Sequence, residues 1–183
     1  PPLRARLLPL AAETMALGGE PHAAEALLAA RKSDQSLLLA RALLAETEGA
    51  HKAALTLSDR AAATGDRLVR ARAAFRAVQL RVADGALAPA QAADALDRQI
   101  MAWRGDAREL KVRRRAAALR AQAGEPRRAL ALLRETAGLF PADAPAIHAQ
   151  LVDIFAAALT AEQQHPLPPL ELVALADENA DLI

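Results

Sequence analysis

The sequence of 183 residues lacks cysteine and tyrosine, and aromatic side chains make up only 2% of it. Without cysteine, the chain has no disulfide framework and no thiolate metal site. The longest apolar run, SLLLARALLA, contains Arg41 and falls well short of the ~20 residues that a membrane-spanning helix needs. The sequence opens PPLRAR, without a methionine or a visible targeting segment. We therefore expect an internal piece of a longer protein, from a bacterial cytoplasm or periplasm.

Signatures of catalysis and of cofactor binding are also missing. There is no glycine-rich phosphate loop and no nucleophile elbow. The four histidines are scattered, without metal-site spacing: His22, His51, His148 and His165. Three serines near helix ends or on helices are explained by capping or solvent exposure: Ser33, Ser36 and Ser58. We predict a protein that is not an enzyme and holds no metal or cofactor.

The residues that are abundant favour helices. Apolar residues make up 53% of the chain, and alanine, the best helix former, is by far the commonest residue. Residues that favour strands are sparse, and short turn signals recur along the chain. The sequence therefore predicts an all-α fold.

One spacing of small residues recurs along the chain. Ala117 precedes Gly124 by seven residues, Ala129 follows it by five, and Pro141 closes the unit. Such alanines let two antiparallel helices touch, Gly124 ends the first helix in the left-handed conformation, and Pro126 opens the second. The same spacing occurs at Ala42, Gly49 and Ala54, and at Ala12, Gly19 and Ala24. A longer third unit fits at Val78 and Gly85, with Ala92 or Ala93 as its small residue.

Capping residues mark the other helix boundaries. Asp34, Asp66 and Asp106 are typical N-caps, and Asp106 with Glu109 forms a capping box. Gly65 and Gly105 precede two of these caps and end the helices before them. The predicted helices are 3–17, 21–31, 35–48, 51–64, 67–84, 89–103, 107–123, 126–139, 144–160 and 169–181.

The segment LKVRRRAAALRAQAGEPRRALALLRETAGLFPAD resembles a tetratricopeptide repeat (TPR). Leu133 of this segment and Leu28 of the first unit stand where the family pattern expects an aromatic, and Ala116 stands where it expects a leucine. The resemblance implies a right-handed superhelix of helical hairpins, an α-solenoid, within a larger bacterial TPR protein. Further repeats of the same chain are then expected outside this segment. The four implied hairpins are 3–34, 35–66, 67–105 and 106–141, and residues 142–183 form a C-terminal helical pair with a proline-rich connection.

Charge is distributed unevenly along the chain. Residues 60–135 carry 17 basic and eight acidic side chains, whereas residues 136–183 carry seven acidic side chains and no Lys or Arg. Arg72 and Arg76 are four residues apart and share a helix face, as do Lys111 and Arg115. The resemblance implies that first helices line a concave groove that binds partner peptides or helices. The candidate contact residues for a protein partner with an acidic segment are Arg72, Arg76, Gln79, Lys111, Arg114 and Arg115.

The resemblance also implies that Lys111 and Arg115 match half of a carboxylate clamp, whose other half would fall at Leu39 and Leu43. A solvated basic face explains the cations equally well, and the acidic C-terminal segment could instead lie beside the basic middle of its own or a neighbouring molecule. Nucleic-acid binding and a purely structural or oligomerisation role are the alternatives. The scarcity of stacking aromatics and the net charge of +1 argue against nucleic acid.

Trp103 is the only tryptophan of the sequence, and we expect it to anchor the packing between hairpins.

Overall fold

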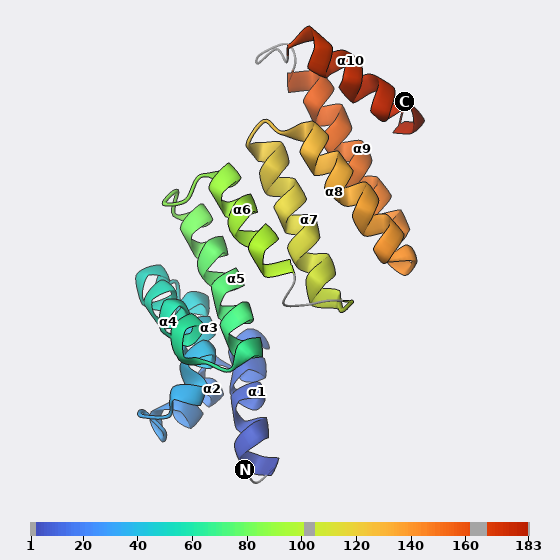
Figure 1. The fold of residues 1–183 in the computed structure, drawn as a ribbon. Coiled ribbons are helices and arrows are strands. Elements are labelled where there is room, and N and C mark those ends of the chain that lie inside the picture. The colour runs from blue at the N-terminus through green and yellow to red at the C-terminus, as the bar shows by residue number, and fades with distance from the viewer. Residues whose placement is uncertain (1–2, 101–104, 162–167, 183) are drawn as a thin grey trace. The chain divides into compact units, whose positions relative to one another are not determined.

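The computed structural model describes residues 3–100, 105–161 and 168–182, and every regular element in these ranges is helical (Figure 1). The all-α prediction is therefore confirmed, and the predicted helices agree with the observed ones to within a few residues. Contacts divide the chain into two compact units, residues 1–86 and 87–183, and each is described separately. Unit 1 holds α1 (Leu3–Leu17), α2 (Pro21–Ala29), η1 (Gln35–Leu37), α3 (Leu38–Thr47), α4 (His51–Thr64) and α5 (Arg67–Ala83). Unit 2 holds α6 (Pro89–Ile100), α7 (Ala107–Gln122), α8 (Pro126–Leu139), η2 (Pro141–Asp143), α9 (Ala144–Ala161), α10 (Pro169–Glu178) and η3 (Ala180–Leu182).

The turn residues end and start the helices as expected. Gly124 has a φ of 77°, a left-handed conformation that suits glycine, and it separates α7 from α8. Pro126 then opens α8, where its missing N–H is harmless. Gly65 is needed for a different reason. Its backbone is extended, but a Cβ atom there would lie 2.6 Å from Val69 Cγ1 and 2.8 Å from Ala61 O.

The connection between α2 and α3 differs from its prediction. The second helix ends at Ala29 instead of residue 31, and the third begins with the 3₁₀ turn η1. Asp34 caps that turn by accepting from the Ser36 N–H at 2.9 Å. The guanidinium of Arg41 donates to three carbonyl oxygens of the connection, those of Leu28, Arg31 and Asp34. Each of these carbonyls also accepts from a backbone N–H, so a single side chain of α3 adds a second hydrogen bond to all three and ties the connection to α3.

In unit 1, each helix packs on the next helix of the sequence, and α1 also packs on α3. The repeat alanines Ala12 and Ala24 are fully buried and belong to one apolar cluster with leucines of α3. Small side chains thus stand where neighbouring helices meet, as the spacing predicted. Leu37, Leu38, Leu39 and Leu43 fill the space between the helices.

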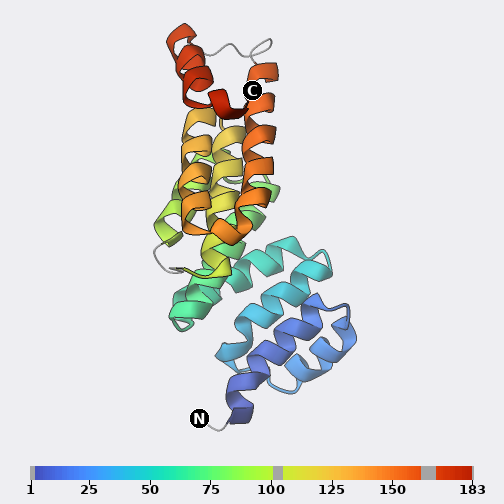
Figure 2. The ribbon, with the colours of Figure 1, turned by 90° about the vertical axis from the view of Figure 1, so that its right-hand side faces the viewer.

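In unit 2, α6, α7, α8 and α9 also pack in sequence order, and α7 contacts α9 as well (Figure 2). Ala117 and Ala129 are fully buried in one cluster with Leu130, Leu133 and Ile147. The predicted 169–181 helix is shorter, because α10 ends at Glu178 and the chain continues as the 3₁₀ turn η3. No helix of the described ranges is long and apolar enough to cross a membrane.

Candidate partner-binding surfaces

The two predicted arginines of α5 are already bound by carboxylates of unit 1. Asp66 caps this helix by accepting from the Val69 N–H at 2.9 Å, and Arg72 and Arg76 follow within the helix, four residues and about one turn apart. Arg72 forms an ion pair with Glu13 of α1. Arg76 forms one with Glu46 of α3. An anionic partner would have to displace these carboxylates, so the pair is a weaker candidate than its spacing alone indicated.

Gln79 lies one turn beyond Arg76 on the same helix and is partly buried. The predicted residues of unit 1 are therefore brought together on α5. The carboxylates that engage the two arginines lie 59 and 30 residues away in the sequence. No local spacing could have revealed them.

The predicted cations of unit 2 lie together on α7. Lys111 is exposed, and Arg114 and Arg115 are partly buried one turn further along. Arg114 Nε donates to Oε1 of Gln150 on α9 at 2.8 Å, and Gln150 Nε2 donates back to the Arg114 carbonyl at 3.0 Å. This reciprocal pair fixes the Arg114 guanidinium beside α9. Sequence reasoning missed Gln150, because no short-range pattern relates it to α7.

Leu39 and Leu43, which stand where the resemblance placed the other half of a carboxylate clamp, are buried in the apolar cluster of unit 1. They offer no polar contact to a ligand. A complete clamp is therefore not built at these positions.

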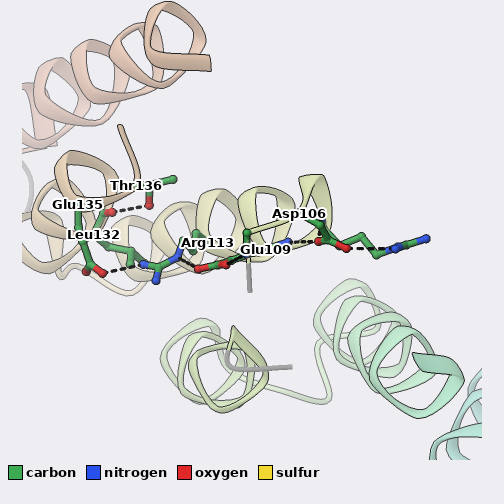
Figure 3. A network of polar contacts seen from close by, with 8 residues as sticks. Asp106, Glu109, Arg113, Leu132, Glu135 and Thr136 are labelled. Atoms are coloured by element: carbon green, nitrogen blue, oxygen red, sulfur yellow. Dashed lines mark hydrogen bonds and ion pairs between the residues drawn. The ribbon is translucent and has the colours of Figure 1, made fainter. Parts of the chain in front are cut away.

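Two further arginines of α7, missed by sequence reasoning, are buried among carboxylates. Arg113 Nε donates to Glu109 at 2.7 Å, and its Nη1 donates to Glu135 of α8 at 3.1 Å (Figure 3). Glu109 also accepts from the Gly105 N–H at 2.6 Å, while Asp106 accepts from the Glu109 N–H at 3.1 Å. The predicted capping box thus continues into a chain of contacts that reaches α8. Only the four-residue step from Glu109 to Arg113 could have been noticed in the sequence.

Arg120, the second buried arginine, joins three segments. It pairs with Asp94 and Asp97 of α6 and with Glu125 before α8. Burial alone would lower its pKa, but the hydrogen bonds to these carboxylates outweigh that effect and raise the pKa above its usual value. The side chain therefore stays charged and holds α6 and α7 together.

A cleft of about 480 Å³ opens between α6, α7 and α8. Its lining residues are Asp97, Ile100, Arg113, Arg120, Arg128, Ala131, Leu132 and Glu135. Arg113 and Arg120 are paired with Glu135 and Asp97 of the same wall, and Arg128 is paired with Glu125, which does not line the cleft. The cleft therefore favours neither an anionic nor a cationic ligand.

The acidic C-terminal segment is held by two arginines of α8. Arg127 pairs with Glu178, with one contact at 3.0 Å between Nε and Oε2. Arg134 binds Asp181 at 2.6 and 3.0 Å and also donates to Asn179 Oδ1 at 3.0 Å. These guanidinium contacts lower the pKa of Glu178 and of Asp181. The prediction that the acidic segment lies beside the basic middle of its own chain is confirmed at these two carboxylates.

The remaining candidates contribute no site. In the described part of the chain, no three potential metal ligands come together. His22, His51 and His148 are exposed, whereas His165 and Trp103 lie outside the described residues. Ser58 corrects our prediction, because it is fully buried on α4 and its Oγ has no hydrogen-bond partner. It is therefore neither a cap nor exposed.

Comparison of the chain with family models, with curated proteins and with solved structures gave no match. The TPR resemblance therefore stays a prediction.

Proposed function

We propose that this chain is a non-enzymatic helical-repeat module that binds an acidic segment of a partner protein. In this proposal the hairpins continue as a TPR-like right-handed superhelix, with the first helix of each hairpin on the inner surface. Two features support it: the helices from α1 to α5 and those from α6 to α9 pack on their sequence neighbours, and α1 packs on α3 as α7 does on α9. The principal contact surface is the α7 surface, defined by Lys111, Arg114 and Arg115.

We choose the α7 surface as the principal contact surface because of how its Arg114 is held. Arg72, Arg76, Arg113 and Arg120 all contact carboxylates of their own unit. Arg114 is instead held by the neutral amide of Gln150. Its positive charge is therefore fixed in position without an acidic partner among the described residues. A carboxylate on a partner would form a charge-assisted hydrogen bond there, which is stronger than one between neutral groups.

The test begins with peptides selected from a random display library against the purified chain, which we expect to be rich in Asp and Glu. The affinity of a selected peptide is then measured by fluorescence anisotropy. Replacing Arg114 and Lys111 by Glu should weaken binding by roughly tenfold or more, since each charge-assisted bond contributes about 1.5–3 kcal/mol. The matched control is Arg67→Glu with Arg70→Glu, two exposed cations on α5. Selected peptides without acidic residues, or an affinity unchanged in the α7 variant, would contradict the proposal.

Nucleic acid is the competing ligand in this test. Many arginines of the basic middle form ion pairs within the chain, including Arg81, Arg127 and Arg134. Their charge is therefore partly neutralised before any phosphate arrives. We expect weak oligonucleotide binding that the α7 variant and the α5 control reduce alike, because it would follow overall charge.

A further inference from the structure

The contact of α10 with the rest of unit 2 is small and combines one buried apolar side chain with an ion pair. Leu175 is the one side chain of α10 that is fully buried, and it joins the cluster of Leu130, Leu133 and Ile147. Leu170 and Val173 remain 85% and 66% exposed. The segment approaches α9 mainly through η3, and α10 does not pair with α9 along its length as α7 does with α8 (Figure 1).

The α8 residues beneath this segment form a surface with a repeating pattern. Arg127, Leu130 and Arg134 are three and then four residues apart, so they share one face of the helix. We call this face the α8 surface. It meets an apolar side chain at Leu175 and carboxylates three and six residues later, at Glu178 and Asp181. The α8 surface and the segment of α10 with η3 are therefore complementary: the apolar side chains belong to one cluster, and each arginine pairs with a carboxylate.

We propose that the α8 surface is a docking site for an acidic amphipathic helix, and that α10 with η3 is its replaceable internal occupant. The partner it fits is a helix with a leucine or similar side chain near its C-terminal end, followed by carboxylates three and six residues later, the second of them beyond the helix end as Asp181 is. Such a helix from another protein competes with α10 for Arg127 and Arg134. The lowered pKa values of Glu178 and Asp181 show that both guanidiniums favour the charged carboxylates. This site shares no residue with the α7 surface and goes beyond the function proposed for it.

Because α10 with η3 occupies the α8 surface, it competes with any added helix and lowers the affinity that is measured for that helix. A segment joined by a short connection has an effective concentration in the millimolar range, so a free helix must bind against it. The apparent affinity for the free helix is reduced by the fraction of molecules in which the α8 surface is open. Weakening the internal contact should therefore strengthen binding from outside.

The probe is a fluorescent synthetic peptide of residues 168–183, added to the full chain. Wild-type chain should bind it weakly. The chain variant E178K/D181K, whose own segment is repelled by α8, should bind it at least roughly tenfold more tightly. The chain variant R127E/R134E, whose α8 repels both its own acidic segment and the added peptide, should not bind this peptide. A peptide carrying E178R and D181R should bind that variant, which shows that the variant chain is folded and that the charges act directly.

Two controls separate this inference from the function proposed above. Replacing Lys111 and Arg114 by Glu should leave binding of this peptide unchanged, and circular dichroism should report equal helix content in all variants. The inference is wrong if E178K/D181K binds the peptide no better than the wild type, or if R127E/R134E binds it equally well. Either result leaves the α7 surface untouched, because that surface is tested with a different peptide.

Discussion

Helices α3 and α7 each open a repeat with the same alanine and glycine spacing, but their buried faces differ in chemistry. In α3 the buried side chains are leucines and alanines. In α7 they include Glu109, Arg113 and Arg120, each less than a tenth exposed. Arginine can fill apolar space with its aliphatic stem while its head group pairs with carboxylates. A chain with few aromatics thus fills the space around these two helices in two ways, with leucines around α3 and, around α7, with ion-paired arginines in addition to apolar side chains.

The difference determines how each unit responds to substitution. An apolar core loses stability with the volume removed, largely independently of salt and pH. A buried ion pair contributes little net stability when compared with an apolar replacement, yet removing one partner leaves an uncompensated charge. We therefore expect unit 2 to be the more sensitive of the two to loss of single charged groups.

The largest effect is expected at Leu39, which is 2% exposed in the apolar cluster of unit 1. Leu39→Ala should lower the free energy of unfolding by about 3 kcal/mol, because it leaves a cavity between packed helices. Urea-induced unfolding followed by circular dichroism measures this. Val152→Ala, at a 38% exposed position of α9, is the control and should change little. A loss below about 1 kcal/mol at Leu39 would mean that unit 1 closes around the cavity.

Arg120→Ala should have the next largest effect, a loss of about 2 kcal/mol. This is less than the roughly 3–5 kcal/mol of a fully buried pair, because Asp94 and Asp97 are partly exposed to water. Arg128 shares Glu125 but is two-thirds exposed, so Arg128→Ala should change stability by less than about 0.5 kcal/mol. Hydrogen exchange should localise the Arg120 effect to α6 and α7. Equal losses in the two variants would show that burial of Arg120 has no energetic consequence.

A double substitution tests whether arginine is needed in α7 at all. E109Q/R113M replaces the buried pair by neutral side chains of similar size, and the unfolding free energy should change by no more than about 1 kcal/mol. Arg113→Met alone should be clearly worse, since it leaves Glu109 charged and 5% exposed. Urea unfolding of E109Q, of R113M and of the double variant gives the coupling free energy between Glu109 and Arg113. If the double variant were as unstable as Arg113→Met, neutral side chains could not replace the buried ion pair, and the prediction would be wrong.

The smallest effect concerns acid pH and is confined to the end of unit 2. Arg127 lowers the pKa of Glu178, and Arg134, with a smaller contribution from His148, lowers that of Asp181. Groups with a lowered pKa stabilise the folded contact above their ordinary values of 4.5 and 3.8, and this contribution is lost as the pH falls below them. The protection factors of α10 amides, which correct for the slower intrinsic exchange in acid, should therefore fall between pH 5 and about pH 3. The leucine-packed amides of α3 are the internal reference, and a parallel fall there would indicate global unfolding.

The helices and their ends could be predicted from the sequence because their signals are local. Gly124, Pro126 and Asp106 act within one turn of their own positions, and the structure confirms all three. The grouping of Lys111, Arg114 and Arg115 on one helix is local in the same way. The pairing of Arg72 with Glu13 is not local, because it depends on how α5 meets α1.

Burial of charge was the other feature that sequence reasoning could not supply. Arg113 and Arg120 lie in an arginine-rich run, and a run of cations usually marks a solvated helix face. Their burial depends on carboxylates of α6 and α8, which only the packing brings near. The acidic C-terminal segment was an intermediate case, since the opposite signs suggested attraction but not the individual partners.

Arg41, whose guanidinium binds the carbonyls of Leu28, Arg31 and Asp34, has a consequence for how the chain tolerates acid and alkali. An arginine keeps its proton at any pH a cell meets, and peptide carbonyls do not titrate there. The Arg41 contacts at the corner between the first two hairpins therefore do not titrate, whereas the Asp34 carboxylate that caps η1 beside them does, and its hydrogen bond with the Ser36 hydroxyl lowers its pKa. Arg41→Lys would keep the charge but lose the planar fork that reaches three oxygens at once.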